Sequence, residues 1–272
     1  MDTKFFLGIG LAIVLVFCGA AVYTTFSKLP AVSAVPAEHE VLYQVSTIDA
    51  LMKGVYDGIL PVGEMKKHGN FGIGTFDALE GEMIVIDGKV YQAKADGNVY
   101  TALDTATTPF ATVTWFERDF TATVEKPVNF SIFSTEMGAR LPSQNMIYAV
   151  RIQGTFPQMK VRAIPAQQKP FPTLTDAAKN QSVYTYTNAT GTVVGFYTPV
   201  FFKGLNVAGY HLHFISGDRL IGGHILDFTV PANTTVEYDI TPAFAMPLPT
   251  SGAFTGVDLS QDLTKELAKI ES

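Results

Sequence analysis

The sequence predicts an α+β protein rich in β-structure, in which two predominantly antiparallel or mixed sheet domains pack together and carry short helices. Hydrophobic residues make up 47% of the 272 residues and charged residues 16%, which is typical of a chain that buries a large core. Most apolar runs are short, β-branched and separated by turn-forming residues, as strands are. We expect an N-terminal segment at 1–38, a β-rich domain at 39–168 and a second β-rich domain at 169–272.

The N-terminal segment has the features of an export signal or a membrane anchor. The 18 residues from Phe5 to Val22 carry no charge. This run is longer than the apolar part of a usual signal peptide, about 7–15 residues, and slightly shorter than a membrane span of about 20. Leu29 to Glu38 follows as a linker rich in Pro, Ala and Ser. Either interpretation places the folded part outside the cytoplasm, secreted or tethered to a membrane.

Composition argues against a nucleic-acid surface and against a disulfide framework. The net charge is −6 and no cluster of Lys and Arg is present, so we expect no nucleic-acid partner. The single cysteine is Cys18, within the N-terminal apolar segment, so the chain cannot form an intramolecular disulfide. Any metal ligands in the folded part must therefore be histidines or carboxylates.

The first domain is expected to contain one short helix and several strands. Residues 46–53 predict a helix, because Ser and Thr at its start suit a capping position and a glycine follows it. Residues 82–93 predict a hairpin around Asp87-Gly88, a sequence typical of a two-residue turn. The apolar runs at 111–116 and 130–133 predict two more strands.

Further hairpins are expected along the rest of the chain. Residues 146–154 and 158–164 predict one hairpin, and residues 182–200 predict another around Asn188–Gly191. Between them, 171–180 predicts a turn with one helical turn. Later, 236–240 predicts a strand and 261–270 a helix with apolar residues on one face. The prolines between Pro165 and Pro172 mark the expected domain boundary.

The stretch at 209–224 contains three of the five histidines and predicts a hairpin of its own. His211 and His213 are two residues apart, so both point to the same face of a strand. With a two-residue loop at Gly217-Asp218, His211 lies opposite His224, and residues paired across strands share a face. A loop longer or shorter by one residue would turn His224 away, unless a bulge restored it.

Three imidazoles on one face predict a metal site. Three histidines are a ligand set of catalytic zinc sites, in which the fourth position is left for water or substrate. Gly222 and Gly223 precede His224, and their missing side chains leave room beside the histidines. We therefore predict a Zn²⁺ site at His211, His213 and His224.

Several motifs together resemble the alpha-acetolactate decarboxylase family. The resemblance runs from about Val41 to the C-terminus, and the combination is more specific than any one motif. The motifs are His68–Asp77, Gly81–Gly88, Val161-Arg162 followed by Lys169–Pro172, Gly209–Phe214 and Gly222–His224.

The resemblance implies an enzyme that converts 2-acetolactate to acetoin and CO2 without redox chemistry. It implies a zinc ion held by the three histidines, in a cleft between two β-rich domains, and a homodimer. The catalytic residues that it implies are Thr75, Glu82, Arg162 and a glutamate of the C-terminal tail, which is Glu271 or else Glu266.

These residues can support a decarboxylation. Loss of CO2 leaves an enediolate, whose negative charge a zinc ion stabilises as a Lewis acid. Arg162 suits the substrate carboxylate, since a guanidinium binds carboxylates through two hydrogen bonds; residue patterns alone do not distinguish it from Arg151. Glu82 or Glu271 would protonate the enediolate. Either glutamate could instead hold an imidazole N–H in place.

Two other functions are compatible with the same histidines. One is an exported zinc hydrolase, in which Glu82 activates water. The other is a metal-binding or ligand-binding module without turnover. An arginine beside the metal favours an α-oxo or α-hydroxy acid over an ester or peptide. Formation of acetoin from acetolactate would distinguish the decarboxylase from both alternatives.

Overall fold

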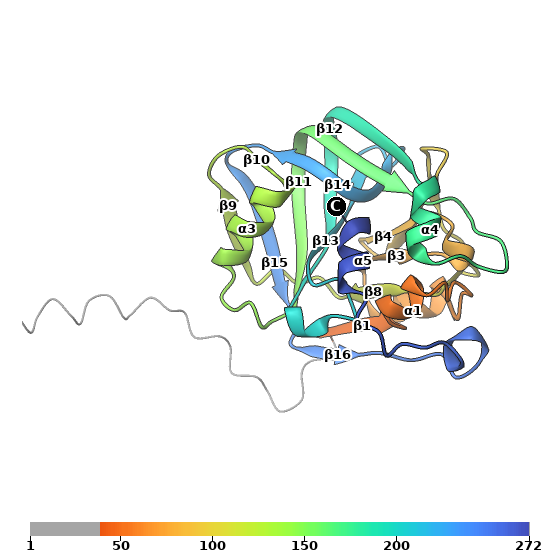
Figure 1. Ribbon diagram of the computed structural model, residues 1–272. Helices are drawn as coiled ribbons and strands as arrows, with labels where there is room; N and C mark the ends of the chain where they lie inside the picture. Colours follow the sequence, from red (N-terminus) through yellow and green to blue (C-terminus); the bar gives the residue numbers. More distant parts are fainter. Residues whose placement is uncertain (1–38, 272) are drawn as a thin grey trace, which may run out of the picture. The chain divides into compact units, whose positions relative to one another are not determined.

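Two seven-stranded sheets form the framework of the computed structural model, which describes residues 39–271 (Figure 1). The first sheet has the strand order β16-β1-β8-β3-β4-β5-β6. Its pairings are antiparallel except that of β1 with β16. Its strands are β1 (Val41–Val45), β3 (Phe71–Thr75), β4 (Glu82–Ile86), β5 (Lys89–Ala93), β6 (Val99–Thr101), β8 (Ala111–Thr114) and β16 (Ala243–Ala245).

The second sheet has the order β10-β14-β13-β12-β11-β15-β9 and is antiparallel throughout. Because β14 also pairs with β11, strands β11 to β14 close into a ring. The strands are β9 (Phe120–Val124), β10 (Val128–Asn129), β11 (Tyr148–Ala163), β12 (Ser182–Thr198), β13 (Gly209–Ser216), β14 (Gly222–Val230) and β15 (Thr234–Ile240). A separate short pair joins β2 (Leu60–Pro61) to β7 (Thr107–Thr108).

The hairpins predicted at 146–164 and 182–200 are wrong. Each of these stretches is one long strand, β11 with 16 residues and β12 with 17, and the two strands pair along their length. The expected turn residues face each other across this ribbon, since Gly154 pairs with Gly191. Pro157 and Asn188 have no pairing partner, and Asn188 has a φ of 51°. They interrupt the ladder without ending either strand.

Five short α-helices accompany the sheets: α1 (Ile48–Met52), α2 (Val62–Met65), α3 (Phe130–Arg140), α4 (Leu174–Ala177) and α5 (Thr264–Ile270), all within residues 39–271. The helix predicted at 46–53 is confirmed as α1. The strand predicted at 130–133 is wrong, because α3 begins there. The Asn129 side chain accepts a hydrogen bond from the Ile132 amide at 3.0 Å and so caps α3, which a run of apolar letters does not reveal.

The apolar side chains form several clusters, and two of them position the site. One lies between the sheets and joins Ile84 of the first to Val194 and Ile215 of the second. Another gathers side chains of α1, α4 and α5. The prediction of a β-rich protein with short helices is confirmed.

The sheets do not divide the chain at residue 168. Strands β9 to β11 precede that residue and lie in the second sheet, whereas β16 follows it and lies in the first. Residues 39–271 fall within one compact unit, and the domain boundaries stay a prediction. The signal or anchor at 1–38, with Cys18, lies outside the described residues. Within 39–271, no helix is long and apolar enough to span a membrane.

Candidate active site and metal centre

The three histidines meet on one face of the β13–β14 hairpin, but in a register that differs from the predicted one. His213 pairs with His224, and the Ser216 amide donates to the Ile221 carbonyl at 2.9 Å, so four residues form the loop. The predicted pairing of His211 with His224 is therefore wrong. Because the loop is longer by two residues, the face of His224 is unchanged. The ring centroids lie 5.0–5.3 Å apart.

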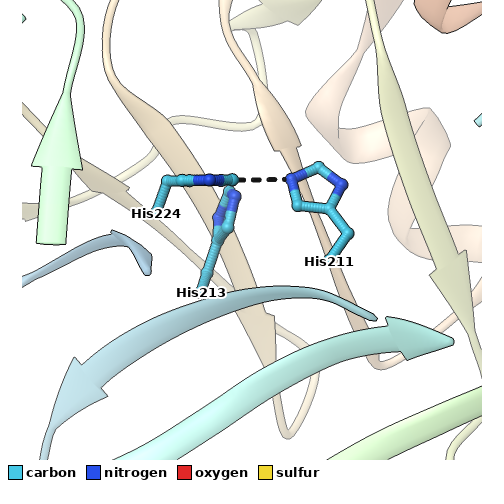
Figure 2. A group of neighbouring side chains, drawn as sticks. All are labelled: His211, His213 and His224. Atoms are coloured by element: carbon cyan, nitrogen blue, oxygen red, sulfur yellow. Dashed lines mark hydrogen bonds between the residues drawn. The ribbon is translucent and has the colours of Figure 1, made fainter. Parts of the chain in front are cut away.

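The triad has the properties of a metal-binding group. All three side chains are buried, and one nitrogen of each lies within 4.8 Å of the other two (Figure 2). The Nε2 atoms of His213 and His224 have no hydrogen-bond partner, and neither has Nδ1 of His211. His213 Nδ1 lies 2.9 Å from the Met83 carbonyl, to which it can donate, and this leaves Nε2 with a free lone pair. His211 Nε2 lies 3.2 Å from His224 Nδ1, within hydrogen-bonding distance.

The electrostatic surroundings keep these imidazoles neutral. Burial, and to a lesser degree Arg162, lowers the pKa of His211 to about 3. Burial also holds the pKa values of His213 and His224 well below the ordinary value. Neutral imidazole is the form that binds a metal. The donor set, its burial and its unpartnered nitrogens therefore fit a zinc ion.

Arg162 and Glu82 reach the triad from two other strands. Arg162 on β11 is the cross-strand partner of His224 on β14, so the two side chains share a face. Glu82 begins β4 in the first sheet. Arg162 Nη1 donates to Glu82 Oε1 at 3.0 Å, and Glu82 Oε2 lies 3.7 Å from His213 Nε2. Burial raises the pKa of Glu82 to about 7, although Arg162 opposes the shift.

The C-terminal tail supplies a second carboxyl. Glu271 follows α5, and its Oε2 lies 3.5 Å from His224 Nε2 and 3.8 Å from His211 Nε2. Its Oε1 lies 3.6 Å from Arg162 Nη2. Burial raises the pKa of Glu271 to about 7 as well. The alternative tail residue, Glu266, is exposed on α5.

Thr75 and Arg151 have contacts of another kind. Thr75 pairs with Glu82 across β3 and β4 and lines the cavity, but its hydroxyl donates to the Gly81 carbonyl at 2.8 Å. Arg151 Nε donates to Glu237 Oε2 at 2.6 Å, so this arginine is engaged in another ion pair.

A small cavity of about 30 Å³ joins these side chains. It is lined on its polar side by the triad, Glu82, Arg162 and Glu271. Its apolar side consists of Ile48, Leu51, Leu79, Phe110, Ile164 and Leu174. Neither this apolar wall nor the Met83 carbonyl was predicted. A backbone carbonyl leaves no mark in a sequence, and the wall residues come from five separate segments.

Comparisons with known proteins agree on one family. The family model described as alpha-acetolactate decarboxylase matches residues 42–261, so the tail glutamate lies beyond the match. An alpha-acetolactate decarboxylase of Methanosarcina mazei is 52% identical over 232 residues, 85% of this chain and 80% of that protein. One of Bacillus subtilis is 37% identical over 231 residues, 85% of this chain and 90% of that protein.

Solved structures give the same result for the fold. The crystal structure of alpha-acetolactate decarboxylase from Bacillus subtilis strain 168 superposes with a TM-score of 0.82 at 36% sequence identity. The superposition covers 85% of this chain and 99% of that chain. A Staphylococcus aureus protein, described as similar to alpha-acetolactate decarboxylase, gives a TM-score of 0.80 at 33% identity.

Proposed function

The chain belongs to the alpha-acetolactate decarboxylase family, and we propose that it decarboxylates 2-acetolactate to acetoin and CO2 in a zinc-dependent reaction. The observation that supports the zinc-dependent reaction is one cavity in which three neutral histidines, an arginine and two carboxyls of raised pKa converge. These groups come from β4, β11, β13, β14 and the tail.

His211, His213 and His224 would hold the zinc ion. When bound, zinc supplies a Lewis acid that stabilises negative charge on substrate oxygens. The Met83 carbonyl fixes the orientation of the His213 ring through its Nδ1 proton. Burial keeps all three ligands in the neutral form that binding requires.

Arg162 would bind and orient the substrate carboxylate. It is buried, its Nη1 is engaged by Glu82, and its Nε–H has no hydrogen-bond partner. An unpartnered buried donor of a permanent cation is well suited to an anionic ligand. The carboxylate that leaves as CO2 would therefore lie beside the Arg162 guanidinium.

Glu82 would deliver the proton that completes the reaction. Loss of CO2 leaves an enediolate, which becomes acetoin when the carbon that carried the carboxylate is protonated. With the carboxylate at Arg162, that carbon would lie near the guanidinium, which Glu82 approaches more closely than Glu271 does, at 3.0 Å against 3.6 Å. A carboxyl with a pKa of about 7 can carry a proton at neutral pH and release it. Delivery from one fixed position would give a single enantiomer.

Acetoin formation by the purified full chain, with metal content measured on the same sample, tests this proposal. We expect acetoin and CO2 in equal amounts and close to one zinc per chain. His213→Ala should lose both zinc and activity. A zinc-loaded wild-type protein that forms no acetoin would overturn the reaction. Full activity in a zinc-free sample would overturn the role of the metal.

We also propose that the enzyme is exported and forms a homodimer. The uncharged run from Phe5 to Val22 supports export, with cleavage or with retention as an anchor. The resemblance to the family supports the dimer. Fractionation with mass measurement of natively expressed protein checks the first statement, and light scattering checks the second.

A further inference from the structure

Helix α5 is attached to the rest of the protein through side chains, and two of these are buried. No backbone hydrogen bond joins residues 248–271 to other parts of the described chain. No residue from 242 to 266 is buried. Within α5, Leu267 and Ile270 are buried to 7% and 6% exposure, whereas the side chains between them are exposed. Two exposed side-chain hydrogen bonds, from Lys53 to Gln261 and from Lys203 to Asp262, and the half-buried Leu263 add to these contacts, but Leu267 and Ile270 are the two side chains of α5 that are buried.

Leu267 and Ile270 dock on the wall of the active-site cavity itself. They belong to an apolar cluster with Ile48 and Leu51 of α1 and Leu174 of α4. Those three partners also line the cavity. The cluster that anchors the tail helix is thus continuous with the apolar wall of the site.

The docked helix determines where Glu271 lies. The Glu271 amide donates to the Leu267 carbonyl at 3.1 Å, so its backbone continues the helix directly after Ile270. Its carboxylate approaches His224, His211 and Arg162 only at 3.5–3.8 Å, which is longer than a hydrogen bond. Burying a carboxyl is unfavourable, and the apolar burial beside it offsets that cost.

We propose that Leu267 and Ile270 are positioning residues, whose docking against α1 and α4 holds the Glu271 carboxyl over the histidine triad for the reaction. This inference rests on the proposed decarboxylation. It assigns no chemical step to either apolar side chain. Their effect on turnover passes through Glu271.

Variants of the full-length, zinc-loaded protein test this role. Ile270→Ala and Leu267→Ala remove most of each anchor, and Ile270→Val and Leu267→Met preserve it. Lys269→Ala is the matched control, because Lys269 lies on the exposed face of the same helix. Glu271→Gln, alone and combined with Ile270→Ala, shows whether the anchor acts through the carboxyl. Each variant is assayed for kcat, KM, zinc content and the rate of trypsin cleavage after Lys265.

We expect Ile270→Ala to lower kcat at least tenfold and to change KM less than threefold, because Arg162 and the triad remain in place. Ile270→Val should restore kcat to within about threefold of wild type. In the Glu271→Gln background, Ile270→Ala should have almost no further effect, as expected for two residues that act as one unit. Cleavage after Lys265 should accelerate severalfold in Ile270→Ala, a readout that does not depend on activity.

Two results would overturn the inference while leaving the decarboxylase intact. One is wild-type kcat in Ile270→Ala despite faster cleavage of the tail. The other is an equal loss of kcat from Ile270→Ala with and without Glu271→Gln, which would place its effect elsewhere. A wild-type protein without acetoin formation would instead overturn the proposed function, and the positioning role with it.

Discussion

Glu82 hydrogen-bonds to Arg162 through one carboxylate oxygen and turns the other toward His213. We expect Glu82→Gln to lower kcat by about 10²–10⁴-fold, the usual contribution of a general acid, because an amide cannot release the proton. Zinc content should remain near wild type, since the histidine triad is unchanged. Glu80→Gln is the control, because the Glu80 carboxylate binds Lys94 instead. Full turnover by Glu82→Gln would exclude the proton transfer.

Arg162 and Arg151 lie on the same strand in different surroundings. Arg162→Lys should lower kcat/KM about 10- to 100-fold, because a lysine replaces the planar guanidinium by a point charge and loses a charged hydrogen bond. Arg151→Lys should change it less than about threefold, since Arg151 pairs with Glu237. Steady-state kinetics on 2-acetolactate measure both. Equal effects of the two substitutions would contradict the assignment of Arg162 to the substrate carboxylate.

The sequence was sufficient to predict that the three histidines share a face, because an error of two residues in the loop length leaves the alternation of side chains along the strand unchanged. The loop is longer by two residues than predicted, which changes the partner of His224 without changing its face. No such local rule brings Arg162 to His224, because their strands are distant in sequence. Glu82, Arg162 and Glu271 were therefore expected only from the family resemblance.

At the scale of elements, the β13–β14 hairpin packs closely against the backbone of β11 at Gly223. A Cβ atom at Gly223 would lie 2.6 Å from the Arg162 carbonyl oxygen, and Gly223 has a φ of 149°. We expect Gly223→Ala to lower the free energy of unfolding by about 2 kcal/mol, as overpacking does, and to reduce zinc content, because His224 is the next residue. Urea unfolding and metal analysis measure both effects.

Gly217→Ala is the control for that substitution, because Gly217 lies in the same hairpin and its Cβ would be 3.8 Å from the nearest heavy atom, the Thr190 carbonyl oxygen. Its stability should stay within about 0.5 kcal/mol of wild type. If both alanine variants behaved alike, crowding against Arg162 would not be the cause. The sequence suggested that Gly222 and Gly223 make room for a metal, whereas Gly223 is required by the backbone of β11.

Where local sequence patterns did not predict an element correctly, pairing between strands determined its extent. Gly154, Pro157 and Asn188 have turn-forming character, yet β11 and β12 continue through them because each strand has the other as its partner. The short hairpin at Asp87-Gly88 was predicted correctly, since its turn is set by two adjacent residues with φ of 52° and 73°. Local rules succeeded where the determining contacts are local.

At the scale of the whole molecule, the packing of the two sheets buries a carboxyl that the proposed chemistry does not use. Asp239 on β15 is the partner of Ala149, which belongs to the cluster between the sheets. It is 3% exposed, and its Oδ2 has no hydrogen-bond partner. Burial raises the pKa of Asp239 to about 8, and the neighbouring carboxylates of Asp119, Glu117 and Glu40 add to the shift, although a backbone hydrogen bond from Glu117 opposes it.

This raised pKa makes the stability of the fold depend on pH. Between its ordinary value of 3.8 and about 8, Asp239 keeps in the folded state a proton that it releases in the unfolded state. The free energy of unfolding should therefore decrease as pH rises through this window. Asp239→Asn cannot ionise, so from pH 6 to pH 8 its loss of stability should be smaller than that of wild type, by on the order of 1–2 kcal/mol.

Urea unfolding of wild type, Asp239→Asn and the exposed-site control Asp104→Asn at both pH values measures this difference. The comparison with wild type is needed because Glu82 and Glu271, whose pKa values are also raised, lower the stability of all three proteins over the same range. Parallel losses in wild type and Asp239→Asn would show that Asp239 ionises equally in both states. A smaller loss of stability in Asp239→Asn than in wild type and Asp104→Asn would show that ionisation of Asp239 destabilises the packed sheets as pH rises.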